Sequence, residues 1–390
     1  MRHLCPFLRL TSMDNLGIYI HIPFCLSKCR YCDFNSFAGK THLQKDYLFA
    51  LIKQIRGTAD RCKGREVDTI YIGGGTPSCM FNGAIQTILA EVRKYYKIRD
   101  DAEISMEANP NSITMDKALE WRNAGVNRIS VGLQTTRSSA LQLIGRTHTK
   151  KDYVNAIQVL HNAGFNNINT DLMIGLPKQK SSDVRYTVDL CAKLGCKHIS
   201  CYSLILEENT PLYAMVKEGK VKLPKEAKTI GMYNTAYTEL TKLGYNRYEV
   251  SNFALDGYRC RHNLNCWNMC EYLGFGAGAC GYYDNVRYEN TKSIEDYINK
   301  INNNVDPIVD YDKCDQSSNY EEMIMLGLRT TDGITIDNLD KCLGCDFVEK
   351  YRDTIDKYQK LGLIEILDGR LRVTSKGFFV LNQIILDFVM

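Results

Sequence analysis

Six short runs rich in β-branched residues alternate with longer amphipathic stretches between residues 17 and 205. The runs are GIYIHI, DTIYIG, EISMEA, NRISVGL, NTDLMIG and HISCYSL. The stretches between them, such as 43–56, 85–96, 152–163 and 183–194, carry apolar residues three and four positions apart, as helices that pack on a sheet do. Alternating strands and helices predict βα units and a parallel sheet. Because six units fall short of the eight of a complete barrel, we predict an α/β fold, a partial (β/α)6 TIM-like barrel with one concave face.

The pattern changes after residue 213, which indicates further domains. We expect an N-terminal extension (1–16), the partial barrel (17–213), a barrel-completing region (214–310) and a C-terminal α+β, winged-helix-like domain (311–390). The third segment is predicted to hold a helix at 226–243, a short strand around YNRYEVSN and a Gly- and Cys-rich loop from 257 to 281. The last segment should hold two or three helices and a β-hairpin. It lacks a clustered basic stripe, so we expect a scaffold or partner-docking role there and no nucleic-acid partner.

The cysteine content of the chain is high, at 16 among 390 residues. Cysteines this dilute do not build a disulfide-stapled scaffold, so we expect reduced thiols, some of them binding metal, and a cytoplasmic location. The net charge of +4 does not call for a polyanionic partner. No run of about 18 apolar residues occurs, so no membrane span is expected. The basic first twelve residues precede Met13, which is the expected start, and a remnant of a targeting arm is the alternative.

Three cysteines crowd the loop after the first predicted strand, in HIPFCLSKCRYCDF. Cys25, Cys29 and Cys32 can bind three irons of a [4Fe–4S] cube and leave the fourth iron open for a cofactor. A zinc site with a distant fourth ligand and three unrelated core cysteines are the alternatives. Zinc sites usually draw pairs of ligands from two places, and core cysteines would not crowd a loop rich in Lys and Arg. The spacing therefore favours the cluster.

Other chemistry-bearing residues follow the next strands at the same end. They are the GGGTP turn at 73–77, Glu107, Gln134 and Asp171. The glycine N–H groups could face a carboxylate or amine with no side chain in the way. Because functional groups of parallel barrels gather at the carboxyl ends of strands, we expect these features to converge on one buried, apolar mouth. Alternatively, Glu107 or Gln134 only caps the helix that follows.

These motifs resemble those of the radical S-adenosylmethionine (SAM) superfamily. The resemblance lies in the Cys-x3-Cys-x2-Cys loop, the GGGTP turn, the EANP stretch and the TDLMIGLPKQ stretch, and it runs from about residue 17 to the C-terminus. Within the superfamily, the chain is similar to the oxygen-independent coproporphyrinogen III oxidase-like branch, and in domain order to its HemW-type haem chaperones. The resemblance implies a [4Fe–4S] cluster that cleaves SAM to methionine and a 5′-deoxyadenosyl radical after one-electron reduction.

The resemblance also implies which residues contact the cofactors. Cys25, Cys29 and Cys32 would bind the cluster, while the amine and carboxylate of SAM would chelate the open iron. The implied SAM contacts are Tyr19, Tyr31, Gly74, Gly75, Thr76, Glu107, Gln134, Arg146 and Asp171. Arg146 is expected near the SAM carboxylate, since a charge-assisted pair in a dry site is strong.

A second motif, CRHNLNCW at 260–267, resembles the HNxxYW motif of the haem chaperones, with Cys266 in place of Tyr. Imidazole and thiolate both bind haem iron, and we predict His262 as the haem ligand. The alternative is that His262 and Trp267 only pack this loop. A second cluster bound by Cys260, Cys266, Cys270 and Cys280 is a further possibility, although their spacing matches no familiar pattern. The glycines at 274, 276, 278 and 281 are expected to permit tight turns.

Two departures from the oxidase pattern favour a carrier. Phe34 stands where the oxidases have a further Cys, and only 24 residues precede Cys25, where the oxidases have a longer arm. We therefore predict a haem chaperone that transfers haem to an acceptor protein and that retains SAM-cleaving potential, with an electron donor such as flavodoxin or ferredoxin. The alternative is a radical SAM enzyme acting on a porphyrin, as coproporphyrinogen III decarboxylase or as haem-modifying methyltransferase. A third class, a DNA-binding winged helix with a sensor cluster, is disfavoured by the near-neutral charge.

Overall fold

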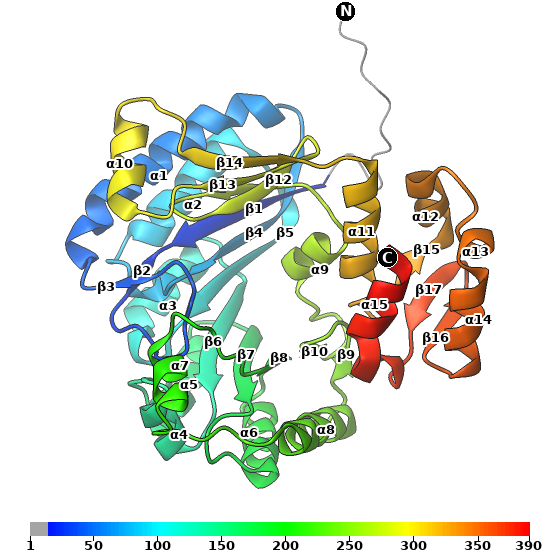
Figure 1. Ribbon diagram of the computed structural model, residues 1–390. Coiled ribbons are helices and arrows are strands. Elements are labelled where there is room, and N and C mark those ends of the chain that lie inside the picture. The colour runs from blue at the N-terminus through cyan, green and yellow to red at the C-terminus, as the bar shows by residue number, and fades with distance from the viewer. Residues whose placement is uncertain (1–14) are drawn as a thin grey trace, which may run out of the picture.

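One curved sheet of twelve strands organises the molecule (Figure 1). The structure is a computed structural model that describes residues 15–390, so almost all of the predicted N-terminal extension, Met13 included, lies outside the described residues. The strand order is β14-β13-β12-β11-β1-β4-β5-β6-β7-β8-β10-β9. No helix within residues 15–390 is long and apolar enough to cross a membrane.

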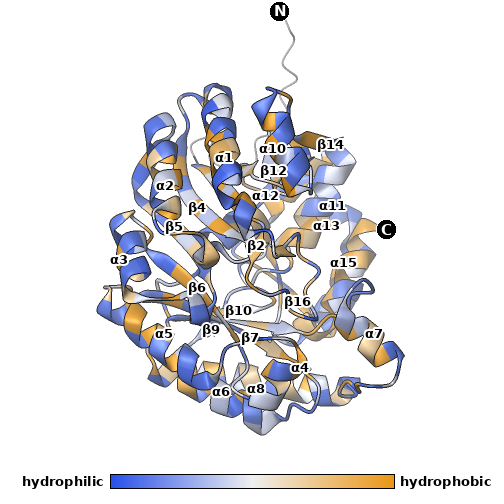
Figure 2. Cartoon of the chain, turned by 90° about the vertical axis from the view of Figure 1, so that its left-hand side faces the viewer, coloured by the Kyte–Doolittle hydropathy of each residue, from blue (hydrophilic) through white to orange (hydrophobic). Residues whose placement is uncertain are grey.

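The six strands predicted from the sequence are neighbours in chain order, and all pair in parallel. They are β1 (Asn15–Ile22), β4 (Glu66–Gly74), β5 (Lys97–Ala108), β6 (Arg128–Gln134), β7 (Asn167–Ile174) and β8 (His198–Ser203). This order confirms the α/β fold and the partial barrel. The outer helices are α1 (Gln44–Thr58), α2 (Ala84–Tyr95), α3 (Met115–Asn123), α5 (Lys150–Asn162), α6 (Ser181–Lys193) and α8 (Glu226–Lys242), and Figure 2 shows them surrounding the strands.

The main core lies between these helices and the convex face of the sheet. Ile18 and Ile20 of β1 are fully buried in one apolar cluster with Leu51 and Ile55 of α1. Burying one such side chain contributes about 2 kcal/mol. Because side chains alternate across a strand, the odd-numbered residues of β1 point to the opposite, concave face. That face is left for the site.

The region 257–281 is not the loop that we predicted. It contains α9 (Arg261–Trp267), β11 (Tyr272–Phe275) and the start of β12 (Cys280–Tyr283). β11 pairs in parallel with β1 and so adds a seventh parallel strand. The sheet continues antiparallel through β12, β13 (Val286–Asn290) and β14 (Ile308–Lys313), with α10 (Ile294–Asn302) between the last two. At the other edge, β10 (Asn252–Ala254) and β9 (Asn246–Arg247) pair antiparallel beyond β8.

Two of the four glycines assigned to turns in this region lie in strands instead. Gly276 and Gly278 have φ angles of 101° and 75° and do form turns. A Cβ atom on Gly274 of β11 would lie 1.9 Å from the carbonyl oxygen of Cys280, and one on Gly281 of β12 would lie 2.1 Å from the Tyr288 ring. Glycine is needed at 274 and 281 because neighbouring strands and side chains approach too closely for a side chain.

The C-terminal segment folds around a core of its own. Its elements are α11 (Gln316–Gly327), β15 (Ile334–Thr335), α12 (Ile336–Leu343), α13 (Phe347–Lys350), α14 (Arg352–Lys360), β16 (Ile364–Leu367), β17 (Arg370–Val373) and α15 (Leu381–Val389). The β16–β17 hairpin lies between helices, as predicted, but the segment holds five helices, from α11 to α15, where two or three were expected. This unit contacts the barrel through Thr331, whose N–H donates to the Tyr248 carbonyl at 2.9 Å.

Replacing Gly274 with Ala should destabilise the fold, because the added Cβ collides with the backbone of β12. We expect the free energy of unfolding to fall by about 2–3 kcal/mol. Gly57→Ala in α1 is the control, since a Cβ there meets nothing within 4 Å; it should raise stability by about 0.5–1 kcal/mol. Urea unfolding followed by circular dichroism measures both, and equal midpoints for Gly274→Ala and the wild type would contradict the assigned packing.

Candidate functional site

The three predicted cluster cysteines lie on the loop that follows β1 at its carboxyl end. Cys25 lies in β2 (Phe24–Cys25), which pairs with β3 (Phe37–Ala38), and Cys29 and Cys32 lie between these two strands. Cys25 is buried, whereas Cys29 and Cys32 are half-buried. The Cys25 sulfur lies 3.4 Å from the Thr76 hydroxyl, and that of Cys32 lies 3.9 Å from the Ser36 hydroxyl. The loop therefore presents its three thiols without a disulfide.

Two cations stand beside these sulfurs. Nη1 of Arg146 donates to the Cys29 sulfur at 3.6 Å. Nζ of Lys28 is held inside the loop by the carbonyls of Phe34 and Ser36, at 3.1 and 3.0 Å. Burial raises the pKa of Cys25 and of Cys32, and the Lys28 ammonium opposes that rise. Cations so placed stabilise thiolates and a negatively charged cluster.

The thiol loop fits an iron–sulfur cube better than a single zinc ion. Each cysteine of a cube binds a different iron, so the three sulfurs need not converge on one point. Zinc requires its ligands around one point. Among residues 15–390, no three His, Cys, Asp or Glu side chains surround a position where one metal ion could bind.

The glycine turn after β4 does not offer its N–H groups to a ligand, contrary to our prediction. Gly74 N–H donates to Oε2 of Glu107 at 3.2 Å, and Gly75 N–H donates to the Ile22 carbonyl at 2.8 Å. Gly74 has a φ of 111°, and a Cβ there would lie 2.5 Å from the His21 ring. The glycines instead let β4 approach the end of β1 and so hold the cysteine loop. The Thr76 side chain still lines a small cavity with Cys29 and Arg146, of about 70 Å³.

Glu107 is bound by the neighbouring strand β4 and does not cap a helix, so that alternative is wrong. Oε1 accepts a hydrogen bond from the Tyr71 hydroxyl at 2.8 Å, while Oε2 accepts the one from Gly74. Burial raises the pKa of Glu107 to about 7, and the nearby Asp171 carboxylate adds to the rise. Near neutral pH this carboxyl can therefore hold or release a proton.

The remaining predicted SAM residues surround the same end of the sheet. Asp171 accepts hydrogen bonds from Ser130, at 3.1 Å, and from Asn169, at 2.7 Å. Arg146 also donates to the Gly132 carbonyl, which ties it to β6. Gln134 is buried at the end of β6 and has a φ of 66°. Tyr31 packs against the small apolar cluster that includes Ile144 and Met173. The Tyr19 hydroxyl forms a hydrogen bond with Nδ1 of His21. The predicted residues thus lie around the same end of the sheet as the cysteine loop.

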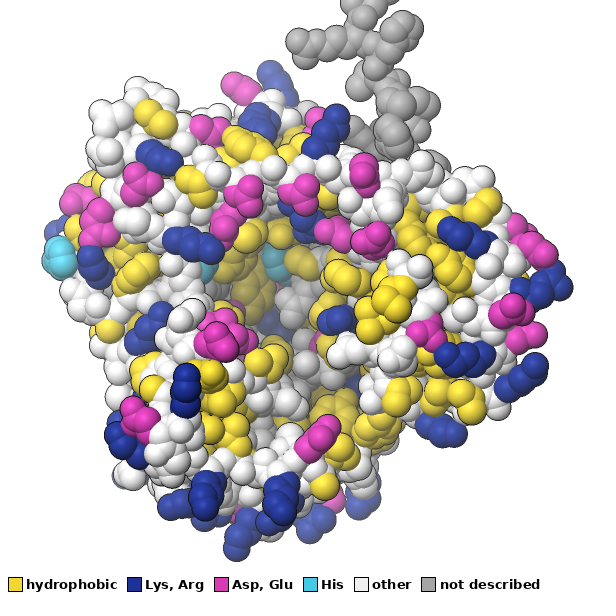
Figure 3. All heavy atoms as spheres, in the orientation of Figure 1, with side chains coloured by type: hydrophobic (Ala, Val, Ile, Leu, Met, Phe, Trp, Pro, Cys, Tyr) yellow, Lys and Arg dark blue, Asp and Glu magenta, His cyan; other side chains and the backbone are white. Residues whose placement is uncertain are grey.

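The concave face behind this mouth is polar, not apolar as we expected. Its strand positions carry Thr69 and Tyr71 in β4, Glu103, Ser105 and Glu107 in β5, Arg128 and Ser130 in β6, Asn169 and Asp171 in β7, and His198 and Ser200 in β8. Figure 3 shows a deep hollow on the side where Figure 1 shows α9 beside the strands. Sequence reasoning missed Glu103, Arg128 and His198, although they alternate with apolar residues along strands that would be continuously apolar if both faces were packed.

His262 lies on α9 and faces this polar interior. It is 5% exposed, Nδ1 lies 2.9 Å from the Thr69 hydroxyl, and its ring stacks on Tyr71 with centroids 5.2 Å apart. Burial lowers the pKa of His262 to about 4, so the ring is neutral at physiological pH. The motif therefore lies on a helix, and the prediction of a loop there is wrong.

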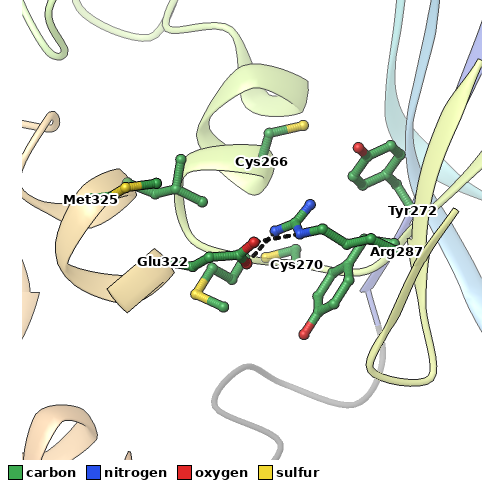
Figure 4. Close-up of a pocket in the computed structure, with 9 residues that line it drawn as sticks. Cys266, Cys270, Tyr272, Arg287, Glu322 and Met325 are labelled. Carbon is green, nitrogen blue, oxygen red and sulfur yellow. Dashed lines mark hydrogen bonds and ion pairs between the residues drawn. The ribbon is translucent and has the colours of Figure 1, made fainter. Parts of the chain in front are cut away.

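Cys266, four residues further along α9, lines a different pocket of about 320 Å³. Figure 4 shows Cys266, Cys270 and Tyr272 on one side of it and Met325 of α11 on the other. The two sides are joined by Arg287, which donates to both carboxylate oxygens of Glu322 at 2.6 and 2.5 Å. Burial raises the pKa of Cys266 to about 12.

The four cysteines of this region do not form the second cluster site that we considered. Cys260 is buried, where its thiol donates to Glu103, while Cys280 is exposed on β12. Cys266 and Cys270 line the pocket of Figure 4. The four sulfurs thus lie in three different environments.

The chain is similar to proteins that are named for haem transfer and porphyrin chemistry. Residues 19–191 match the radical SAM superfamily, and residues 315–380 match the HemN C-terminal domain. The chain is 32% identical over 367 residues to the haem chaperone HemW of Bacillus subtilis, covering 94% of this chain and 97% of that protein. It is 38% identical over 273 residues to the haem chaperone HemW of Escherichia coli, covering 70% and 71%. The structure of Escherichia coli coproporphyrinogen III oxidase (HemN), a radical SAM enzyme, superposes with a TM-score of 0.83 at 22% identity, covering 97% and 90%, which shows a shared fold.

Glu107 should make stability depend on pH. Its folded-state pKa of about 7 lies above the ordinary value of 4.5, so the folded protein keeps a proton that the unfolded chain releases. This contribution is complete below pH 4.5 and is lost as the pH rises to 7. The free energy of unfolding is measured by urea titration of iron-free, reduced protein at pH 4.5, 6 and 8. Between pH 4.5 and 8, that of the wild type should fall by about 2–3 kcal/mol relative to that of Glu107→Gln.

Glu91→Gln is the control for this titration. The hydrogen bond from the Arg56 guanidinium lowers the pKa of the half-buried Glu91, so its titration is almost complete above pH 4.5. The wild type should show no comparable loss relative to Glu91→Gln. Parallel pH profiles of the wild type and Glu107→Gln would contradict the raised pKa.

Proposed function

The chain belongs to the radical SAM superfamily and, within it, to the family of the HemW haem chaperones, and on this premise we propose that it binds a [4Fe–4S] cluster, SAM and haem and transfers the haem to an acceptor protein. The observation that carries the proposal is the pairing of two sites on one sheet. A thiol loop with adjacent cations lies at the carboxyl ends of the strands, and a buried, neutral imidazole lies deeper on the same concave face.

The cluster would be held by Cys25, Cys29 and Cys32. SAM would lie beside it, against the nine residues given above as its contacts. Once both are bound, one-electron reduction makes SAM cleavage available. The protein residues act by position and charge: Arg146 holds the loop against β6 through Cys29 and Gly132, and Glu107 braces the glycine turn.

His262 would be the haem ligand. When Nδ1 donates to the Thr69 hydroxyl, Nε2 carries the lone pair that haem iron requires. Nε2 forms no hydrogen bond with any of residues 15–390, and the atom is not fully buried. A neutral ring and a second nitrogen free of hydrogen bonds to residues 15–390 are what an axial ligand needs.

An enzyme acting on a porphyrin is the second candidate. The shared fold with coproporphyrinogen III oxidase and the residues gathered around the cysteine loop favour it. The carrier is preferred because Phe34, at the position of the additional oxidase cysteine, is an exposed side chain that carries no metal-binding group. An electron donor such as flavodoxin or ferredoxin would serve either function, and the haem acceptor would be a separate protein.

Removing one cluster ligand should abolish the cluster. Anaerobically reconstituted wild type is expected to hold about four irons per chain with the absorption of a [4Fe–4S] cluster, and Cys25→Ala should lose both. Cys280→Ala is the matched control, because Cys280 is exposed on β12, away from the loop. A full cluster in Cys25→Ala would contradict the ligand assignment.

Haem binding should depend on His262. We expect His262→Gln to weaken haem binding at least about tenfold and to shift the Soret band, while His42→Gln, on the exposed start of the first helical turn, leaves both unchanged. Thr69→Val should retain haem but raise its reduction potential, because an imidazole that loses its Nδ1 hydrogen bond is a weaker donor. Unchanged affinity and spectrum in His262→Gln would refute the ligand.

The two candidate functions separate in one assay. A carrier should leave coproporphyrinogen III unchanged when the reduced protein is incubated with SAM, and it should pass bound haem to an apo-haemoprotein. Formation of a vinyl-bearing porphyrin product would instead establish the enzyme and overturn the carrier.

A further inference from the structure

Arg128 is a buried guanidinium whose side chain makes no hydrogen bond with residues 15–390. It begins β6 on the concave side of the sheet, and its side chain is 2% exposed. Its Nε atom is fully buried without a hydrogen bond, and neither Nη atom makes a hydrogen bond or an ion pair within 4 Å to any of residues 15–390. Buried guanidinium groups in proteins are almost always paired, because leaving such a charge uncompensated is costly.

The groups around Arg128 are already engaged elsewhere. The Glu103 carboxylate, whose charge acts on Arg128, accepts hydrogen bonds from the backbone N–H groups of Arg261 and His262, at 3.0 and 3.2 Å, and so binds the first turn of α9. The Tyr71 hydroxyl donates to Glu107, and the Tyr248 hydroxyl lies 2.7 Å from Nε2 of His198. The N–H donors of the Arg128 guanidinium are therefore available to hydrogen-bond a ligand that enters the hollow.

Arg128 lies near the haem ligand and far from the cluster. Tyr71, Ser105 and Arg128 are register partners on three successive strands, and His262 stacks on Tyr71, so Arg128 lies at the same level of the sheet as the imidazole. At about 3.3 Å per residue, six residues of strand separate it from Gln134 at the cluster end by roughly 20 Å. The carboxylate of a SAM molecule chelating the cluster would thus lie at the other end of β6.

We propose that Arg128 binds a carboxylate of the ligand in the hollow, and that this carboxylate is a propionate of haem. A guanidinium matches a carboxylate through two parallel hydrogen bonds, and that pair is strong in a site shielded from water. Haem carries two propionates at one edge, so Arg128 binds that edge while His262 faces the iron. The hollow of Figure 3, beside α9, is where the porphyrin enters. This inference rests on the proposed haem-binding function and adds the residue that recognises the propionate.

The test compares haem with its dimethyl ester, which keeps the ring and the iron but removes both negative charges. Anaerobically purified wild type, Arg128→Met and Arg128→Lys are titrated with each compound and followed by Soret absorption. The wild type should bind haem at least about tenfold more tightly than the ester, in line with one charge-assisted pair. Arg128→Met should bind both with the affinity of the ester, and Arg128→Lys should keep part of the preference. Arg185→Met, at an exposed ion pair with Glu239, should keep all of it.

Two further measurements separate ligand recognition from a structural role. The ligand-free Arg128→Met variant should unfold at the same temperature as the wild type or higher, because it removes an unpaired buried charge. A lower temperature together with an intact ester preference would show a structural arginine and overturn the proposal. SAM binding by calorimetry should be unchanged in Arg128→Met. Loss of SAM binding with the preference intact would assign the carboxylate to SAM and also overturn it.

The wild type alone distinguishes failure of this proposal from failure of the proposed function. Equal binding of haem and ester by the wild type overturns the role of Arg128 and leaves a haem carrier. Binding of neither compound overturns the haem function and, with it, the propionate site.

Discussion

Polar groups on the concave face of the sheet must find partners there, and this requirement organises the site. Glu107 is satisfied by Tyr71 and the glycine turn, and Asp171 by Ser130 and Asn169. The bonds of Glu107 to β4 and of Asp171 to Ser130 join neighbouring strands, so satisfying these buried carboxylates also fixes the strand ends around the cysteine loop. Arg128 stands out on this face, because its guanidinium makes no hydrogen bond with residues 15–390, whereas the carboxylates of Glu103, Glu107 and Asp171 all accept hydrogen bonds.

The placement of α9 follows from the same requirement. Glu103 of β5 accepts hydrogen bonds from the first backbone N–H groups of α9, which a short helix cannot satisfy by itself. This contact holds His262 against Thr69 inside the barrel, while Cys266 at the other end of the helix lines a different pocket. His262 and Cys266 belong to one sequence motif, but they lie in two separate environments. Only His262 shares the concave face with the cluster loop.

The fold was predictable because its signals are local. Strand runs such as DTIYIG and the three- and four-residue spacing of their helices depend on neighbouring residues, and the cysteine spacing depends on one loop. The segment 257–281 was not predictable in this way, because α9 is capped by Glu103 from 158 residues away and Gly274 lies in a strand through contact with β12. The polar interior could have been recognised, since Glu103 and Glu107 alternate with buried Ile104 and Met106. We instead assumed that a site excluding water must be apolar. Hydrogen-bonded polar groups can line a buried site equally well.

Tyr71 connects the two ends of the concave face. Its ring stacks on His262 with centroids 5.2 Å apart and on Tyr19 at 6.4 Å, and its hydroxyl donates to Glu107, which in turn binds the turn beside the cysteine loop. Rotation of Tyr71 would break its hydrogen bond to Glu107 or its stacking on His262. Displacing the His262 ring would remove one of the two contacts that orient Tyr71, the other being its hydrogen bond to Glu107. Tyr71 thus gives the His262 end of the concave face a direct physical contact with the end that holds the cysteine loop.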